Sequence, residues 1–243
     1  MTRPGVVVLH GLGGTPHSVL PLTAAVHGAG YTTVAPTLPG HGTHPQDLIA
    51  RTWHEWVAFV LVTCDELSAR CGGAGIILVG QSMGASLAIA AAAQRIDVVG
   101  VAAVNAVVHQ PDPDATEHLE YLITRGRTMQ PAGVPDLRDP DAHDSSYVEL
   151  ALTSLVQLGV GADATRAVLP VLAMPLFVAS SDHDNVVDPA DSDELAATVA
   201  GTVTRLRLAN SGHVAALDLD RELLCRELLT WLVDLTDRSA SPG

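Results

Sequence analysis

The sequence predicts an α/β fold, in which a mostly parallel central sheet is flanked by helices. Short apolar segments alternate with helix-forming segments along most of the 243 residues, which is typical of an open α/β sheet. Apolar residues make up 47% of the chain, so a large core can be buried in one domain. Aromatic residues make up only 3%, and we therefore expect this core to consist mainly of Ala, Val and Leu.

The predicted strands are short, apolar and bounded by Gly, Pro or Asp. Such segments are typical of parallel strands that are covered on both faces. They cover residues 6–9, 32–36, 75–79, 98–104, 176–180 and 203–208.

Helices are predicted between these strands. One begins at Trp53 and has apolar side chains at helical spacing on one face, and another consists of strong helix formers after Gly84. Asp188 and Pro189 are typical of an N-cap followed by a first helical residue. The predicted helices cover residues 53–67, 85–95, 189–200 and about 221–235.

Residues 106–169 interrupt the alternation. They are rich in Pro and Asp, show no convincing strand, and contain helical pieces near residues 117–125 and 145–158. Because the segment is too long for a simple connection, we expect a core of residues 1–105 and 170–243 with a small cap, or lid, at 106–169. An irregular crossover without a functional role is the alternative. The cap residues that we expect to line an acyl pocket are Leu119, Leu122, Ile123, Met129, Leu152, Leu155 and Val156.

Charge and apolar runs limit the possible partners. The formal charge of −14 disfavours binding to nucleic acid or to anionic membrane surfaces. No apolar run reaches the roughly 18 residues of a membrane span, and the first strand leaves no room for a signal peptide. The few, unclustered cysteines predict free and mostly buried thiols in a cytoplasmic protein, without a disulfide or a metal site.

The pentapeptide Gly80-Gln81-Ser82-Met83-Gly84 follows a predicted strand and precedes a predicted helix. Such a pattern arises by chance about one time in ten in a chain of this length, so its flanks must support any interpretation. The order of strand, G-x-S-x-G and helix is that of a nucleophile elbow. We expect the glycines to relieve crowding in a tight turn, and Ser82 to stand at the carboxyl end of the strand.

A base and an acid for this serine are expected at the same edge of the sheet, because ligands of open α/β sheets bind there. His213 lies between the last predicted strand and the last helix and is the favoured base. His10, in the first turn, is a weaker rival, and the alternative for it is a packing residue of the loop. The loop after residue 180 offers Asp182 and Asp184, of which we favour Asp184. Asp188 in the same loop is set aside as an N-cap.

Backbone N–H groups are expected to form an oxyanion hole. One donor follows the nucleophile, at Met83, and the other comes from the glycine-rich turn after the first strand, at Leu12. A dinucleotide-binding loop is the competing interpretation of that turn. It fails because the third glycine of G-x-G-x-x-G would fall at position 16, which is Pro16.

Taken together, these residues resemble the α/β-hydrolase superfamily, and within it the small bacterial carboxylesterases and monoacylglycerol lipases. The resemblance covers nearly the whole chain and rests on residues 10–14, 38–43, 52–56, 80–84, 183–189 and 211–213. Two features depart from the family pattern: Gln81 replaces the more usual Leu or Phe, and the cap is poor in aromatics.

The resemblance implies an α/β-hydrolase fold and a serine esterase that acts on a small acyl ester through an acyl-enzyme. It assigns the nucleophile to Ser82, the base to His213 and the orienting acid to Asp184, without a metal or organic cofactor. A monomer or homodimer is expected. The alternatives are a triad acting on thioester, C–C or amide bonds, an acyltransferase, or a ligand-binding relative without turnover.

Overall fold

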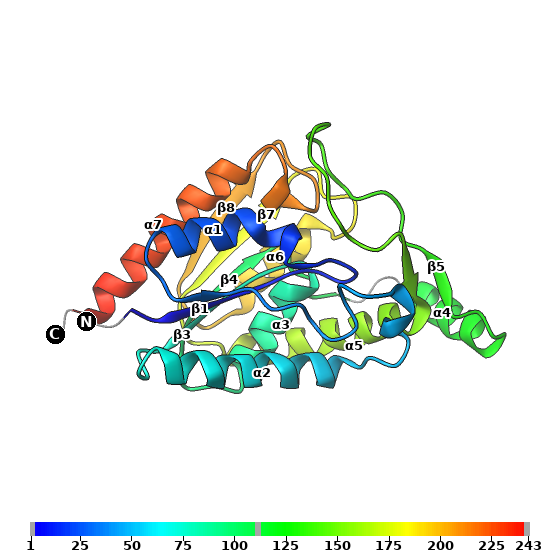
Figure 1. The fold of residues 1–243 in the computed structure, drawn as a ribbon, viewed down its shortest axis with the longest axis horizontal. Coiled ribbons are helices and arrows are strands. Elements are labelled where there is room, and N and C mark those ends of the chain that lie inside the picture. Colours follow the sequence, from blue (N-terminus) through cyan, green and yellow to red (C-terminus); the bar gives the residue numbers. More distant parts are fainter. Residues whose placement is uncertain (1–2, 110–112, 241–243) are drawn as a thin grey trace.

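A computed structural model of the chain describes residues 3–109 and 113–240 and contains a central sheet with helices on both faces (Figure 1). The strand order is β2-β1-β3-β4-β7-β8, and all neighbours in this sheet are parallel. This arrangement confirms the predicted α/β class. The strands are β1 (Gly5–Leu9), β2 (Thr33–Val34), β3 (Ile76–Gln81), β4 (Val98–Val104), β7 (Leu176–Ser181) and β8 (Val203–Leu208).

Side chains of β1 alternate between two hydrophobic clusters, one on each face of the sheet. Val6 and Val8 pack with the cluster that contains α1 (Leu20–Gly28) and α7 (Arg221–Ala240). Val7 and Leu9 pack with the cluster on the opposite face. The helices of that second face are α2 (Trp53–Arg70), α3 (Met83–Ala92), α5 (Leu152–Val168) and α6 (Pro189–Thr198). Burial on both faces explains why the central strands are mostly apolar.

Helix starts follow the signals in the sequence. Thr52 and Glu55 form a capping box at the start of α2, and each side chain bonds to the backbone N–H of the other. Asp188 caps α6 by accepting a hydrogen bond from the N–H of Ala190, as predicted. Short 3₁₀ helices cover Pro16–Val19, Pro45–Leu48, Leu169–Val171 and Ala215–Leu217.

The segment expected to be a cap contains a small antiparallel pair of strands, β5 (Met129–Pro131) and β6 (Glu149–Ala151), preceded by α4 (Pro113–Thr124). The prediction of no strand here is therefore wrong, and the helix expected near residues 145–158 begins only at Leu152, as α5 (Leu152–Val168). Tertiary contacts hold the chain extended before α5 begins. Tyr147 donates from its backbone N–H to the carbonyl oxygen of Gly13 and from its hydroxyl to that of Gly40. Local propensity cannot reveal such contacts.

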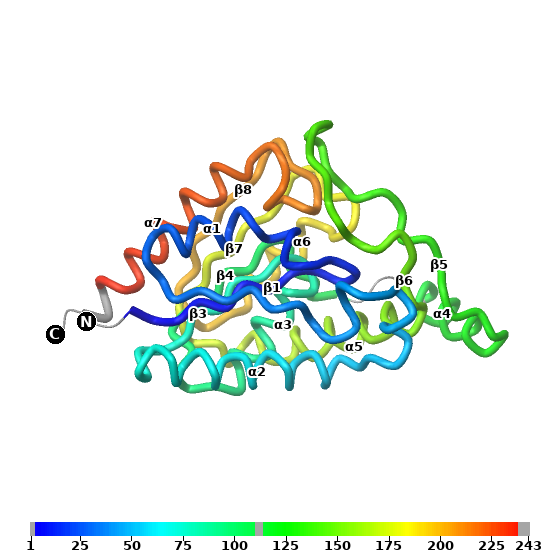
Figure 2. Tube along the Cα trace, viewed as in Figure 1, coloured from blue at the N-terminus to red at the C-terminus, as the bar shows by residue number. Residues whose placement is uncertain are grey.

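Helix α5 also lies within the range expected to be a cap, but it packs in the helical layer of the core. Its Thr165 hydroxyl donates to the carbonyl oxygen of Ser86 on α3. A Cβ atom on Gly161 would lie 2.3 Å from the ring of Trp53 on α2, so the two helices approach closely there. The part of the segment that stands beyond the sheet is therefore α4 and the β5–β6 pair with its long connection. Figure 2 shows that connection beside the loops that follow β7 and β8.

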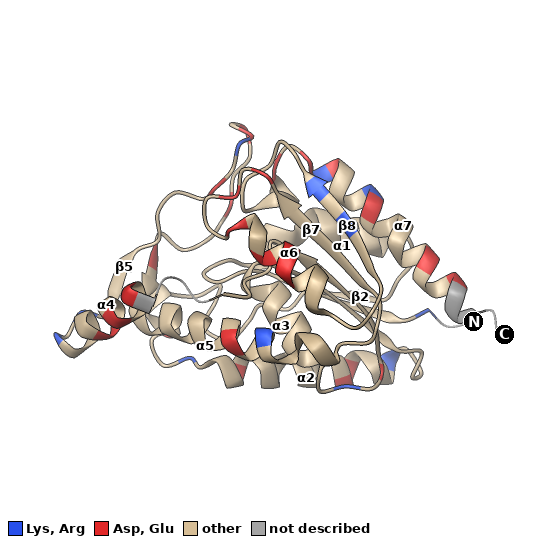
Figure 3. Cartoon of the chain, turned by 180° about the vertical axis from the view of Figure 1, so that it is seen from behind, with Lys and Arg blue, Asp and Glu red and all other residues tan. Residues whose placement is uncertain are grey.

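Charge and thiols complete the description of the fold. Acidic residues are spread over α4, α6 and the neighbouring loops, among fewer basic ones (Figure 3). Cys64, Cys71 and Cys225 are free thiols, and burial raises the pKa of Cys64 to about 11. Within the described ranges, no helix combines the length and the apolar character that crossing a membrane requires.

Candidate active site

Ser82 occupies a strained turn between the end of β3 and the start of α3. Its φ of 58° and ψ of −129° are rare for a residue with a side chain. A Cβ atom on Gly80 would lie 2.2 Å from the carbonyl oxygen of Gly84, and one on Gly84 would lie 2.3 Å from that of Leu9. Larger residues at these two positions would collide with backbone atoms, which confirms the predicted reason for the glycines. The Ser82 N–H donates to the carbonyl oxygen of Val104 on β4, at 2.9 Å.

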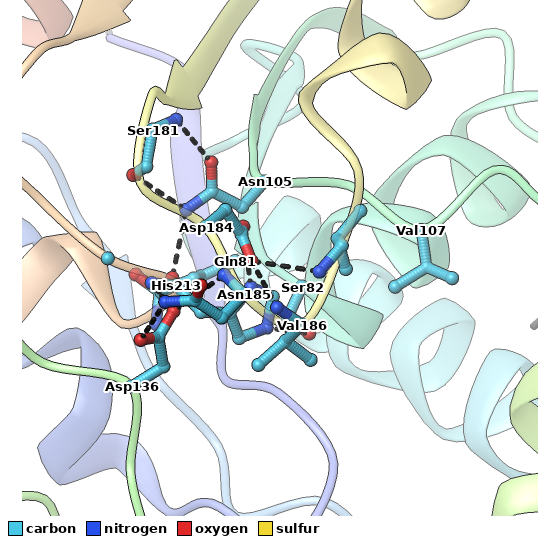
Figure 4. A network of polar contacts seen from close by, with 12 residues as sticks. Gln81, Ser82, Asn105, Val107, Asp136, Ser181, Asp184, Asn185, Val186 and His213 are labelled. Carbon is cyan, nitrogen blue, oxygen red and sulfur yellow. Dashed lines mark hydrogen bonds and ion pairs between the residues drawn. The ribbon is translucent and has the colours of Figure 1, made fainter.

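Ser82, His213 and Asp184 form one chain of hydrogen bonds (Figure 4). The Oγ atom of Ser82 is 2.8 Å from Nε2 of His213, and Nδ1 of His213 is 2.8 Å from Oδ2 of Asp184. Because a carboxylate only accepts, Nδ1 carries the proton, and Nε2 is left to accept the proton of the serine hydroxyl. The other carboxylate oxygen of Asp184 accepts hydrogen bonds from the N–H groups of Val186 and Val187.

The alternative candidates lie elsewhere. Asp182 forms an ion pair with Arg207, whose Nε and guanidinium N–H groups lie 3.0 and 2.7 Å from one carboxylate oxygen. His10 is fully buried, and its Nε2 accepts a hydrogen bond from the N–H of Leu38. Burial lowers the pKa of His10 to about 4, which keeps the ring neutral. His10 is therefore a packing residue of its loop, which was the alternative that the sequence left open for it.

The backbone of His213 is fixed by two side chains that the sequence analysis did not single out. Its N–H donates to Oδ2 of Asp136, and its carbonyl oxygen accepts from Nδ2 of Asn105, both at 2.9 Å. Asn105 directly follows β4 and has a φ of 48°, a conformation that Asn adopts more readily than most residues. Its position directly after a predicted strand is the feature of the sequence that could have identified Asn105. Asp136 lies in the long connection between β5 and β6, where nothing in the local sequence marks it.

Gln81, which departs from the family pattern, has a defined contact. Its Oε1 atom accepts a hydrogen bond from the N–H of Ala216, at 3.0 Å, three residues after His213. The side chain is buried, so this acceptor satisfies an N–H group that water does not reach. Gln81 therefore links the turn of the serine to the loop of the histidine.

A cavity of about 190 Å³ adjoins Ser82 and His213. Leucine and tyrosine side chains contribute to its wall, and so do several polar side chains. The apolar contributors include Leu12, Tyr147, Leu150, Leu155 and Leu158, and the polar ones include Ser18, Asp136, Asp144 and Ser146. Ser18 donates a hydrogen bond to Asp144, at 2.7 Å. The cavity thus combines an apolar wall with hydroxyl and carboxylate groups.

Of the residues expected to line an acyl pocket, Leu155 is among the described residues around this cavity. The other expected residues, Leu119, Leu122, Ile123, Met129, Leu152 and Val156, are not. The reason lies in the packing: α4, which carries the first three, packs against α5, Met129 packs against the main core, and Leu152 is fully buried. Leu150 and Tyr147, from the unexpected strand region, lie where the cap helices were expected.

The turn after β1 lies against the serine. A Cβ atom on Gly11 would lie 3.1 Å from Cβ of Ser82, and Leu12 follows at the wall of the cavity. Among the described groups, the backbone N–H donors of Leu12 and Met83 have no hydrogen-bond acceptor. The structure therefore brings both of the expected oxyanion donors to the region of Ser82, at the N-terminus of α3.

Sequence and structure comparisons agree with this geometry. The chain is 36% identical to the thermostable monoacylglycerol lipase of Bacillus sp. (strain H-257) over 231 residues. The matched region covers 93% of this chain and 88% of that protein. A structure reported for LipS and LipT, two metagenome-derived lipolytic enzymes, has a TM-score of 0.90 and 28% identity over 96% of this chain and 94% of that one. The monoacylglycerol lipase of Paleococcus ferrophilus has the same fold, with a TM-score of 0.78 and 21% identity over 97% of both chains. The model of the alpha/beta hydrolase family matches residues 6–226, and the chain belongs to that family.

Proposed function

We propose that the protein hydrolyses carboxylic esters through an acyl-enzyme formed on Ser82. The observation that carries this proposal is the continuous hydrogen-bond chain from Ser82 through His213 to Asp184, next to a cavity that can hold an acyl group. Membership of the alpha/beta hydrolase family and the similarity to a monoacylglycerol lipase support it.

In the acylation half, Oγ of Ser82 attacks the ester carbonyl carbon while Nε2 of His213 takes the hydroxyl proton. Asp184 stabilises the resulting imidazolium and holds its ring in place. The tetrahedral intermediate then collapses, the bond to the alkoxy oxygen breaks, and the leaving alcohol takes the proton from His213. In the deacylation half, water attacks the acyl-enzyme by the same route, which releases the carboxylic acid and restores the Ser82 hydroxyl.

The negative charge that develops on the carbonyl oxygen needs fixed donors. The N–H groups of Leu12 and Met83 are the proposed pair, since both lie near Ser82 and bind no described group. Met83 is also the first residue of α3, where the helix dipole adds positive potential. Such preorganised donors contribute about 3–4 kcal/mol each to stabilisation of the transition state in serine hydrolases.

A monoacylglycerol is the substrate class that fits the cavity best. The leucines of the wall suit an acyl chain, whereas Ser18, Asp144 and Ser146 offer hydrogen-bonding groups to the hydroxyls of a polar alcohol. A substrate with one apolar chain and one polyol head can use both kinds of group. The name of the relative from Bacillus sp. is consistent with this choice.

Two measurements test the proposal. The wild-type protein is expected to hydrolyse p-nitrophenyl esters and to release fatty acid from monoacylglycerol faster than from triacylglycerol. An alkyl phosphonate should label wild-type protein stoichiometrically and Ser82→Ala not at all. Failure to label the wild type, or labelling that persists in Ser82→Ala, would overturn the esterase proposal. Hydrolysis of acyl thioesters or amides in preference to oxygen esters would instead favour the alternative chemistries of the same triad.

A further inference from the structure

The carboxylate of Asp136 contacts both loops that carry the acid and the base of the site. Its Oδ2 accepts from the N–H of His213 and from the N–H of Asn185, each at 2.9 Å. Its Oδ1 accepts from the side-chain amide of Asn185, also at 2.9 Å. Asn185 directly follows Asp184, so one carboxylate from the β5–β6 connection joins the loop after β7 to the loop after β8 (Figure 4).

The backbone of the same residue fits closely against the histidine loop. The carbonyl oxygen of Asp136 accepts a hydrogen bond from the N–H of Val214, at 3.2 Å. A Cβ atom on Gly212 would lie 2.8 Å from that carbonyl oxygen, so only a glycine permits this approach. Gly212, His213 and Val214 therefore all lie against Asp136.

A second carboxylate fixes the connection itself. Asp218, which is fully buried, accepts hydrogen bonds from the N–H groups of Arg138, Asp139 and Gly212. The backbone around Asp136 is therefore anchored independently of the contacts that Asp136 makes with Asn185 and His213. Loss of the Asp136 carboxylate alone should leave this anchor in place.

Asp136 is ionised at the pH where such a site would work. Burial raises the pKa of Asp136. The N–H and side-chain amide of Asn185 and the N–H of His213 together lower it by more, so the pKa lies below its usual value. Hydrogen bonds to an ionised acceptor are roughly twice as strong as neutral ones. Three such bonds converge on this group from two loops that are separate in sequence.

We propose that Asp136 is a positioning residue, which sets the distance between the loops of Asp184 and His213 so that both triad hydrogen bonds form at once. Asp136 does not contact the reacting atoms in this role. The inference rests on the proposed esterase function, and it adds that the β5–β6 connection contributes to alignment of the triad as well as to the wall of the cavity. Small errors of alignment are costly, since a displacement of about 1 Å reduces rates by about a hundredfold.

The kinetic test compares Asp136→Asn with a matched control, Asp141→Asn. Asp141 lies on the same connection and is exposed, and its side chain accepts no hydrogen bond from the described residues. For p-nitrophenyl butyrate, Asp136→Asn should lower kcat by about tenfold or more, with KM changed by less than about twofold, because alignment and not binding is lost. Asp141→Asn should match the wild type. An unchanged kcat in folded Asp136→Asn would overturn the proposal, as would an equal loss in the control.

A milder variant covers the case in which Asp136→Asn folds poorly. Asn185→Ala removes the amide that reaches Oδ1 of Asp136 and leaves the backbone bond intact. It should lower kcat by a few fold, and its effect should not add to that of Asp136→Asn, because both act through the same contact. Full additivity of the two variants, or a wild-type kcat in Asn185→Ala, would contradict the proposed role.

Proton NMR gives a readout that does not depend on turnover. The Nδ1–H of His213, bonded to Asp184, should give a downfield signal in the wild type that is weakened or lost in Asp136→Asn and retained in Asp141→Asn. If the wild type hydrolyses no ester, the proposed function fails, and this signal still decides the positioning role. Retention of an unchanged signal in Asp136→Asn would reject that role even in an active enzyme.

Discussion

The side chain of Asn105 joins the ends of β4 and β7 to the carbonyl oxygen of His213. Its Nδ2 donates to that oxygen at 2.9 Å and to Oγ of Ser181 at 3.0 Å, while its Oδ1 accepts from the N–H of Ser181 at 2.8 Å. Both the nitrogen and the oxygen of this buried side-chain amide thus have hydrogen-bond partners within the protein. Asn105 binds the carbonyl oxygen of His213 and Asp136 binds its N–H, so the sheet itself helps to hold the loop of His213.

Asn105→Ala is expected to destabilise the protein by about 2–4 kcal/mol. It leaves the N–H of Ser181 unpaired, and it places at positive φ an alanine, which lacks the side-chain hydrogen bonds that hold Asn105 in this conformation. Urea unfolding at neutral pH measures this change. Asn105→Gly is the matched control, since glycine tolerates the same φ and loses only the hydrogen bonds. Equal stability of Asn105→Ala and the wild type would show that these buried bonds contribute little.

The choice between the two loop carboxylates leads to a second prediction. Asp184→Asn should lower kcat for p-nitrophenyl butyrate by about 10⁴-fold, since an amide at this position favours the wrong tautomer of His213. Asp182→Asn should change kcat by less than about twofold, because its partner is the exposed Arg207 and the pair is mostly screened by solvent. Steady-state kinetics of the two variants decides the matter. A large loss in Asp182→Asn would mean that the loop rearranges in the working enzyme.

The sequence predicted the fold, and it pointed to three residues that the structure brings into one hydrogen-bond chain, because both depend on local patterns. The G-x-S-x-G turn needs glycines where backbone atoms crowd, and β3 and α3 on either side have unmistakable compositions. Asp184 and His213 follow strands whose carboxyl ends must share an edge in a parallel sheet.

What escaped prediction depends on contacts between distant segments. Tyr147 bonds to the turns at Gly13 and Gly40, far away in sequence, and the neighbouring strand β6 pairs with β5. The contacts of Asp136 with Asn185 and His213 form only because the β5–β6 connection reaches the loops after β7 and β8. The pattern of apolar and polar residues within 106–169 does not predict these contacts between distant segments.

The cavity wall gives a third prediction, on acyl-chain length. Leu155 lines the cavity beside Ser82, so Leu155→Trp should reduce the free volume of about 190 Å³ and lower kcat/KM for dodecanoate esters relative to butyrate esters. A change of about tenfold in this ratio corresponds to about 1.4 kcal/mol of lost chain binding in the transition state. A series of p-nitrophenyl esters from two to twelve or so carbons measures it.

Leu122→Ala is the control for this series. Leu122 lies on α4 and is not among the described residues around the cavity, so the ratio between long and short esters should stay at the wild-type value. A shift toward short esters in Leu122→Ala, with none in Leu155→Trp, would restore α4 as the acyl-binding element that the sequence suggested.

The last prediction concerns pH and the junction between β4 and the segment that contains α4. His109 lies between two carboxylates: Nδ1 is 2.7 Å from Asp191 and Nε2 is 2.8 Å from Glu194. The hydrogen bond to Asp191 raises the pKa of His109 above 6.5, and attraction to both carboxylates adds to this, while Arg166 opposes it. A raised pKa in the folded state means that the charged pair stabilises the fold below about pH 6.5, and that this stabilisation is lost as the pH rises through the folded value.

His109→Gln tests this sign. The imidazole is more than a third exposed, so solvent screening limits the ionic contribution to less than about 1 kcal/mol. For a chain of this size, the melting temperature of His109→Gln should fall about 2 °C below that of the wild type at pH 6. The gap should narrow at pH 9, where the histidine is neutral and keeps only ordinary hydrogen bonds. Differential scanning calorimetry of both proteins at the two pH values measures it, and a gap that widens with rising pH would show that neutral His109 is the stabilising form.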